Sequence, residues 1–267
     1  MNTNAENNPS SQGSSEPSKD TADASASASH AWRISSFEDI RDLPASSVAS
    51  KELSKARRSS ACSKKKPARE YTVGEEIANS ISHGIGAALA VAAIPICVVI
   101  SVSHGGGVAL AAALIYTISM LLEYLASTLY HALVPLPAKK VFKVLDHSAI
   151  YLFIAGSYTP FCLITLENDG GIVLFVIVWV LAFAGIAFEA IMRERQPRWL
   201  TGVIYLVMGW LVAFRLPQLV GLLEPLALAL LAIGGVCYTI GVPFYIAKKI
   251  RYMHSVFHLW VLAGSIF

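Results

Sequence analysis

Three histidines with helical spacing are the residues of this chain best suited to chemistry. His131 ends the run Ser127-Thr-Leu-Tyr-His131, and His254 and His258 form a His-x-x-x-His pair. Residues four apart share one face of a helix, so the pair can hold one ion and Ser127 lies one turn from His131. Because imidazole nitrogens and water are the ligands of zinc in open catalytic sites, the pattern predicts Zn2+ bound by His131, His254 and His258. The alternative is that these histidines are hydrogen-bonded polar groups that bridge helices.

Two further residues are candidates for a catalytic role beside such a metal. Asp146 could ligate it directly, or could act as a general base that takes a proton from water. Ser127 could donate a hydrogen bond to a substrate carbonyl or to the oxyanion that develops from it. A nucleophilic Ser127 is disfavoured, because no histidine remains as its base if all three bind metal. The alternative for Ser127 is a hydrogen bond to a carbonyl of its own helix.

The elements that must position these residues are apolar helices. The chain is 55% hydrophobic and 15% charged, with a mean hydropathy of +0.56, and its apolar residues come in long runs. Helices of about 20 apolar residues cross a bilayer, which predicts an all-α integral membrane protein with a seven-helix bundle. The expected spans are 77–101, 108–134, 142–166, 172–192, 200–219, 225–247 and 252–267.

The distribution of Lys and Arg predicts the orientation of the bundle. Basic residues end the N-terminal tail and lie between alternate spans, at Lys139, Lys140, Lys143, Arg193, Arg195, Arg198, Lys248, Lys249 and Arg251. The positive-inside rule then places the N-terminus in the cytoplasm and, after seven spans, the C-terminus outside. The three histidines and Asp146 consequently lie at the cytoplasmic leaflet.

Residues 1–69 differ in composition from the rest of the chain, which divides it into a tail and a membrane domain, 70–267. The tail is Ser-rich and has few aromatic residues, so we expect it to be disordered. Its basic end either attracts anionic lipid headgroups or serves only as a topology signal. The polar N-terminus predicts no secretory signal peptide, and we expect a multi-pass protein of the plasma membrane.

Other polar residues fall within the predicted spans. Glu75, Asn79 and His83 recur every fourth residue, and they either orient metal ligands or form a structural hydrogen-bonded seam. His147 is expected to bond to a neighbouring span. Glu123 lies deeper than the histidines, where it either lines a route to the metal or is a neutral carboxyl bonded to a backbone carbonyl.

Several motifs, which occur in order along the expected spans, resemble those of the hemolysin III family. This family is the bacterial branch related to the progestin and adiponectin receptors and more distantly to the alkaline ceramidases. The motifs are the runs 75–84, 127–131, 145–160 and 254–264. The resemblance covers the chain from about Glu70 onward. It implies a seven-helix bundle with a cytoplasmic N-terminus and a zinc held by the three histidines. It also implies that Asp146 contacts the zinc through water and that Ser127 sits beside it.

The function that these predictions favour is zinc-dependent hydrolysis of a lipid amide or ester. One alternative is a receptor or sensor of membrane-lipid homeostasis in which zinc is structural. Another is the cytolytic activity in the family's name, although the chain has no evident amphipathic pore-forming segment. The expected partners are membrane lipids and the zinc ion, and no nucleic acid.

Overall fold

The computed structural model describes residues 71–192, 195–247 and 249–267, together with Ser54. The predicted tail, 1–69, lies outside the described residues except for Ser54, and so do Arg193 and Lys248.

Within this part of the chain every regular element is helical, which confirms the predicted all-α class. The α-helices are α3 (Val73–His104), α4 (Gly106–Ala132), α5 (Leu136–Pro160), α6 (Gly171–Met192), α7 (Arg198–Trp210), α8 (Leu216–Leu222), α9 (Pro225–Ile246) and α10 (Met253–Ile266). A π-helical turn, η2 (Phe161–Thr165), extends α5, and a 3-10 segment, η4 (Leu211–Arg215), joins α7 to α8.

Six helical segments of the described chain are long and apolar enough to cross a membrane. They are Val73–His104, Gly106–Ala132, Leu136–Thr165, Gly171–Met192, Arg198–Leu222 and Pro225–Ile246. The last helix, α10, is apolar but has only 14 residues. These six segments and α10 correspond to the seven predicted helices of the bundle. That α10 also crosses the membrane stays a prediction.

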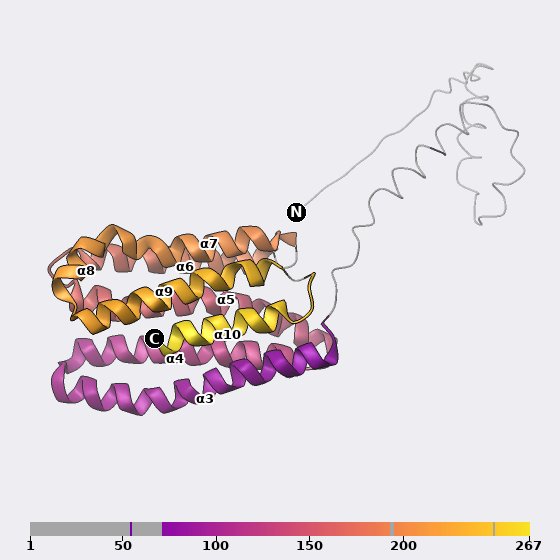
Figure 1. Cartoon of the computed structure of the whole chain (residues 1–267), viewed down its shortest axis with the longest axis horizontal. Helices are drawn as coiled ribbons and strands as arrows, with labels where there is room; N and C mark the ends of the chain where they lie inside the picture. Colours follow the sequence, from indigo (N-terminus) through magenta and orange to yellow (C-terminus); the bar gives the residue numbers. More distant parts are fainter. Residues whose placement is uncertain (1–53, 55–70, 193–194, 248) are drawn as a thin grey trace, which may run out of the picture. The chain divides into compact units, whose positions relative to one another are not determined.

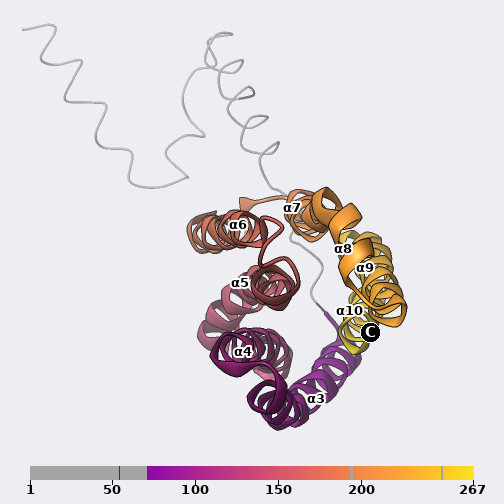
Figure 2. The same ribbon diagram turned by 90° about the vertical axis from the view of Figure 1, so that its left-hand side faces the viewer.

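The helices lie side by side along one direction (Figure 1). α3 packs against α4 and α10, α5 against α4 and α6, and α9 against α7 and α10. Seen end-on, α10 lies between α3 and α9 (Figure 2). Because successive rods alternate in direction, the starts of α3, α5, α7 and α10 meet the ends of α4, α6 and α9, on the right in Figure 1. The candidate site residues are carried by these helix ends.

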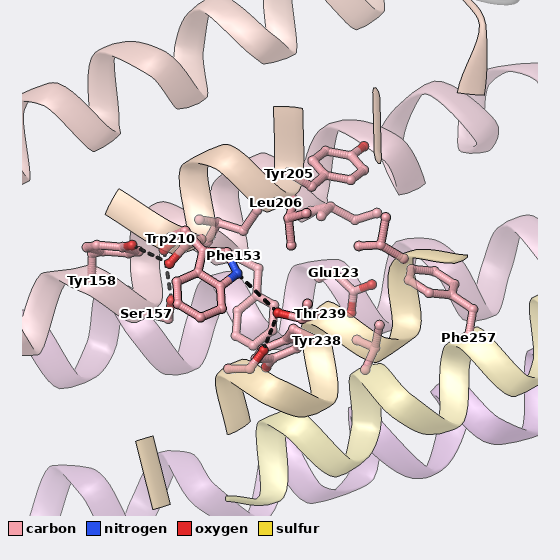
Figure 3. A pocket seen from close by; sticks show the side chains of 16 residues that line it. Glu123, Phe153, Ser157, Tyr158, Tyr205, Leu206, Trp210, Tyr238, Thr239 and Phe257 are labelled. Carbon is pink, nitrogen blue, oxygen red and sulfur yellow. Dashed lines mark hydrogen bonds between the residues drawn. The ribbon is translucent and has the colours of Figure 1, made fainter. Parts of the chain in front are cut away.

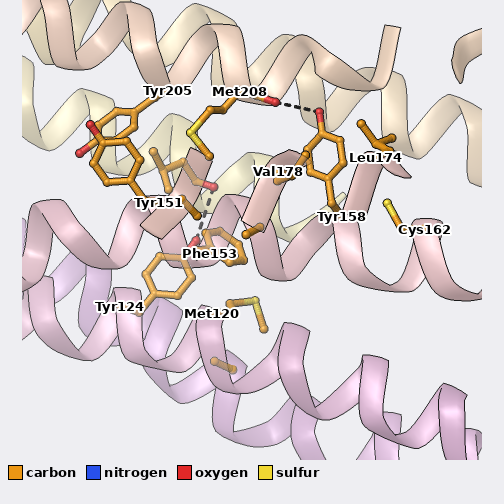
Figure 4. Packing of buried hydrophobic residues seen from close by; sticks show 14 of the residues in the cluster. Met120, Tyr124, Tyr151, Phe153, Tyr158, Cys162, Leu174, Val178, Tyr205 and Met208 are labelled. Carbon is orange, nitrogen blue, oxygen red and sulfur yellow. Dashed lines mark hydrogen bonds between the residues drawn. The ribbon is translucent and has the colours of Figure 1, made fainter. Parts of the chain in front are cut away.

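Apolar side chains cover the outside of the bundle and aromatic residues fill much of its interior. Val180 and Phe183 on α6 are 61% and 60% exposed, as is expected of side chains that face lipid. The interior cluster includes Tyr124, Tyr151 and Met208, all nearly inaccessible (Figure 4). Inside the bundle even backbone carbonyls need donors, and the Tyr158 hydroxyl donates to the Met208 carbonyl at 2.9 Å.

Two helices begin earlier than the hydrophobic pattern predicts, because local signals outweigh it. α3 begins at Val73 instead of Ile77, since Thr72 and Glu75 form a capping box at its start. α5 begins at Leu136 instead of Phe142, with Pro135 as its N-cap and a proline in its first turn.

The orientation of the bundle is a prediction that surface labelling checks. In a background without native cysteines, a cysteine at Asn168 should react with a membrane-impermeant maleimide added to intact cells. A cysteine at Lys139 should react only after the membrane is permeabilised, because the positive-inside rule places it in the cytoplasm. The reverse pattern would contradict the predicted orientation.

Candidate metal centre

The three predicted ligands converge at one end of the bundle. His131 lies in the last turn of α4, and His254 and His258 lie in the first two turns of α10. All three are buried, and one nitrogen from each lies within 4.8 Å of the others. The Nε2 atoms of His254 and His258 are 3.2 Å apart. Two nitrogens bonded at 2.0–2.1 Å in tetrahedral geometry lie about 3.3 Å apart, so the spacing fits a zinc-sized ion.

His131 is oriented by a carboxylate that the sequence analysis did not single out. Its Nδ1 lies 2.6 Å from Oε2 of Glu76, whose other oxygen accepts a hydrogen bond from Lys139 at 2.6 Å. The amide nitrogen of Asn79 lies 3.3 Å from the same Nδ1 atom. A carboxylate on one ring nitrogen fixes the tautomer and leaves the other nitrogen free for a metal. The Nε2 atom of His131 indeed has no hydrogen-bond partner among the described residues.

His258 is oriented by the backbone of α3. Its Nδ1 lies 3.2 Å from the carbonyl oxygen of Asn79 and 3.1 Å from Oγ of Ser82, which itself donates to that carbonyl. Ser255 donates to Oδ1 of Asn79 at 2.5 Å. Asn79 therefore contacts two predicted ligands, which supports the alternative in which it orients them.

Glu75 has a structural role, as in the hydrogen-bonded seam that was one alternative for Glu75, Asn79 and His83. Its Oε1 accepts a hydrogen bond from the backbone N–H of Tyr252 at 2.9 Å, and Tyr252 has a φ of 61°. A positive φ is unfavourable for a bulky residue, so this contact helps to hold the tight turn before α10. Since Glu75 also forms the cap of α3, it ties the start of α3 to the segment that places His254.

Ser127 and Asp146 are both buried, and Ser127 lies one helical turn before His131 on α4. The Oγ of Ser127 has no hydrogen-bond partner in the described part of the chain, so the alternative bond to its own helix is absent. A hydroxyl at zero exposure without a partner among the described residues is uncommon, because buried polar groups are usually hydrogen-bonded. Asp146 is 5% exposed and interacts electrostatically with Tyr71, Tyr130 and Glu123. It is not part of the group of three histidines.

Tyr71 covers the histidines at the end of the bundle. Its ring stacks on His254, with centroids 5.2 Å apart, and meets His131 edge-on at 5.6 Å. Burial raises the pKa of the Tyr71 hydroxyl to about 12, although Arg198 beside it acts in the opposite direction. The hydroxyl is therefore neutral at physiological pH. Sequence reasoning missed this cover because an aromatic residue beside a basic segment is also typical of an ordinary membrane interface.

His147 belongs to a separate pair. Its Nδ1 lies 2.8 Å from Oε1 of Glu189 on α6, and Gln196 donates to the other oxygen of Glu189. The expected bond to a neighbouring span is thus confirmed.

An apolar cavity of about 130 Å³ lies between α5, α7, α9 and α10 (Figure 3). Most of its lining is aliphatic or aromatic, including Phe153, Leu206 and Phe257. The ring of Phe257 stacks on that of His254, with centroids 5.5 Å apart, so one wall of the cavity contacts the histidine cluster. Glu123 of α4 also lines the cavity. The other alternative for Glu123, a hydrogen bond to a backbone carbonyl, is absent among the described contacts.

The Glu76–His131 pair gives a prediction about metal affinity. Glu76→Gln should weaken zinc binding by about 10–100-fold, because it removes the carboxylate that fixes the ring. Competition with a chromogenic chelator measures the change. Glu189→Gln is the matched control, since it alters a buried carboxylate–histidine pair outside the cluster and should leave the affinity unchanged. Equal affinities for both variants would contradict the assigned role of Glu76.

The fold and the site together define a class of protein: a helical membrane bundle with three buried histidines at one end. Residues 71–267 match the family model described as Haemolysin-III related, and the chain belongs to this family. It is 42% identical over 195 residues to the Hemolysin-3 homolog of Bacillus subtilis (strain 168), covering 73% of this chain and 91% of that protein. It is 43% identical over 193 residues to Hemolysin-3 of Bacillus cereus, covering 72% and 88%.

A more distant relative is the Monocyte to macrophage differentiation factor of Homo sapiens. It is 27% identical over 164 residues, which cover 57% of this chain and 65% of that protein. The family expected from the sequence motifs is confirmed by these matches.

Proposed function

We propose that this chain is a zinc-dependent hydrolase that cleaves an amide or ester bond of a lipid within the plasma membrane. The observation that carries the proposal is the group of three buried imidazoles, with nitrogens within 4.8 Å of one another, next to the unpaired hydroxyl of Ser127. Three nitrogen ligands on a buried site are the donor set of many catalytic zinc centres.

The number of ligands favours an enzyme over a sensor with structural zinc. Structural zinc sites are usually closed by four protein ligands, whereas catalytic sites have three and keep one position open. Among the residues that the structure describes, no fourth His, Cys, Asp or Glu joins His131, His254 and His258. This supports Asp146 as a base rather than a ligand.

The roles of the surrounding residues follow from their chemistry. When bound, zinc supplies Lewis acidity and lowers the pKa of water to about 7. Asp146 accepts a proton from the attacking water, whose oxygen forms a bond to the carbonyl carbon. Ser127 donates a hydrogen bond to the oxyanion that develops on the carbonyl. The C–N or C–O bond then breaks, and Asp146 returns the proton to the leaving amine or alcohol.

Other features bind the lipid and limit the entry of water. Tyr71 lies over the histidine rings and shields them from the aqueous side. The apolar cavity suits part of an acyl chain, since apolar cavities of about this size stay dry and take up small hydrocarbons. The lipid can approach from the bilayer itself.

Mass spectrometry of lipids from cells with and without the gene tests the proposal. Cells without the gene should accumulate at least one lipid amide or ester, and the wild-type gene should restore the original level. A gene that carries Asp146→Asn should fail to restore it. Identical lipid profiles, or full restoration by the Asp146→Asn variant, would contradict hydrolysis at this site.

A further inference from the structure

A second polar pair lies deeper in the bundle than the histidine cluster. Glu123 of α4 and His83 of α3 are 2% and 1% exposed, and Oε1 of Glu123 is 3.8 Å from Nδ1 of His83. This separation is too long for a good hydrogen bond. Oε2 of Glu123 and both ring nitrogens of His83 have no hydrogen-bond partner among the described residues. Buried groups of this kind are costly unless something else satisfies them.

Glu123 differs in this respect from the other polar side chains of the cavity wall. Six of these have hydrogen-bond partners within the chain: Ser157, Tyr158, Tyr205, Trp210, Tyr238 and Thr239. Their polar atoms are therefore already satisfied, as expected for groups that only support the wall. The carboxyl group of Glu123 remains available to whatever occupies the cavity (Figure 3).

The pair also connects the cavity to the metal centre. The ring of His83 stacks on that of His258, with centroids 3.5 Å apart and an interplanar angle of 20°. Glu123, Ser127 and His131 follow each other at intervals of four residues on α4, so they share one face of the helix. A molecule in the cavity that contacts Glu123 therefore lies on the helix face that leads to Ser127 and His131.

We propose that Glu123 and His83 form a hydrogen-bonding subsite for the polar part of a lipid whose acyl chain lies partly in the cavity. This rests on the proposed function and extends it to the chemistry of the ligand. The subsite selects a lipid that carries an amide N–H or a free hydroxyl beside its acyl carbonyl, because such a group satisfies the carboxyl of Glu123. An acyl ester without a hydrogen-bond donor leaves that carboxyl unsatisfied and binds more weakly.

Two probes with the same acyl chain test the subsite in the purified full-length protein. N-oleoylethanolamine carries an amide N–H and a hydroxyl, whereas methyl oleate carries neither. Displacement of a fluorescent fatty-acyl reporter gives the Kd of each. The wild type should bind N-oleoylethanolamine about tenfold more tightly, which corresponds to about 1.4 kcal/mol. Glu123→Leu should reduce this ratio to below about twofold, and Glu123→Gln should retain most of it, because an amide still forms hydrogen bonds.

Matched controls separate the subsite from a general effect on the cavity. Ser157→Ala and Thr239→Val alter polar groups of the same wall that are already paired, and both should keep the wild-type ratio. His83→Phe keeps an aromatic ring against His258 but removes the nitrogens, so it should lower the ratio severalfold. This variant also decides the matter if Glu123→Leu does not fold.

Some results would overturn the subsite. These are a wild-type ratio below twofold, an unchanged ratio in Glu123→Leu or His83→Phe, or an equal loss in the two controls. Mass spectrometry of released oleate in the same samples reports on hydrolysis separately. Selective binding that depends on Glu123, without any released oleate, would refute the hydrolase and leave the subsite standing.

Discussion

Replacement of Asp146 by Asn is expected to lower hydrolytic turnover by about 10²–10⁴-fold, the usual worth of a positioned general base. The amide keeps the shape of the side chain and can still hold water, but it cannot accept the proton. Zinc content should be nearly unchanged, because Asp146 does not belong to the group of three histidines. Turnover is measured as fatty acid released from a lipid amide or ester, and zinc by elemental analysis of the purified protein.

The same variant distinguishes three roles of Asp146. A direct ligand predicts a marked loss of zinc, and a general base predicts a loss of turnover with zinc retained. A residue that only stabilises the middle of α5 predicts normal zinc and turnover, with a loss of about 1 kcal/mol in stability, the usual effect of a single substitution. Normal turnover together with normal zinc would therefore end the general-base proposal.

Replacement of His258 by Ala is expected to remove most of the bound zinc. One missing imidazole leaves an incomplete set of ligands, and it also removes the ring whose Nδ1 contacts the Asn79 carbonyl. Elemental analysis after dialysis against a chelator should find about one zinc per chain in the wild type and little in the variant. His254→Ala and His131→Ala should behave in the same way.

His104→Ala is the control for the histidine variants. His104 lies at the last position of α3, is exposed, and contacts only the Ile100 carbonyl among its described hydrogen bonds. Its removal should leave the zinc content unchanged. Zinc that persists at the wild-type level in all three ligand variants would refute the assignment of the metal centre.

Much of this architecture could be predicted from the sequence, because hydrophobic length and helical spacing are local signals. The spacing of His254 and His258 already placed both rings on one face of a helix. The end-to-end order of the spans placed His131 at the same end of the bundle. These inferences needed only the 3.6-residue period and the alternation of spans, and the structure brings all three residues together.

The contacts that orient the ligands could not be predicted in the same way. Glu76 pairs with His131 across 55 positions of sequence, and Glu75 pairs with Tyr252 across 177. Such pairs depend on how α3 docks against α4 and α10, which no local pattern specifies. One signal was available, because Glu76 lies three residues before Asn79 and seven before His83 and so shares their face. The four-residue spacing of Glu75, Asn79 and His83 pointed to Glu75 instead of the adjacent Glu76.

X-ray absorption at the zinc edge of the purified protein tests the central claim most directly. We expect about one zinc per chain, bonded to nitrogen and oxygen at about 2.0–2.1 Å, with the scattering of three imidazole rings in the spectrum. His258→Ala should remove that signal. A protein that contains no zinc, or zinc bonded to sulfur at about 2.3 Å, would contradict a metal centre formed by His131, His254 and His258.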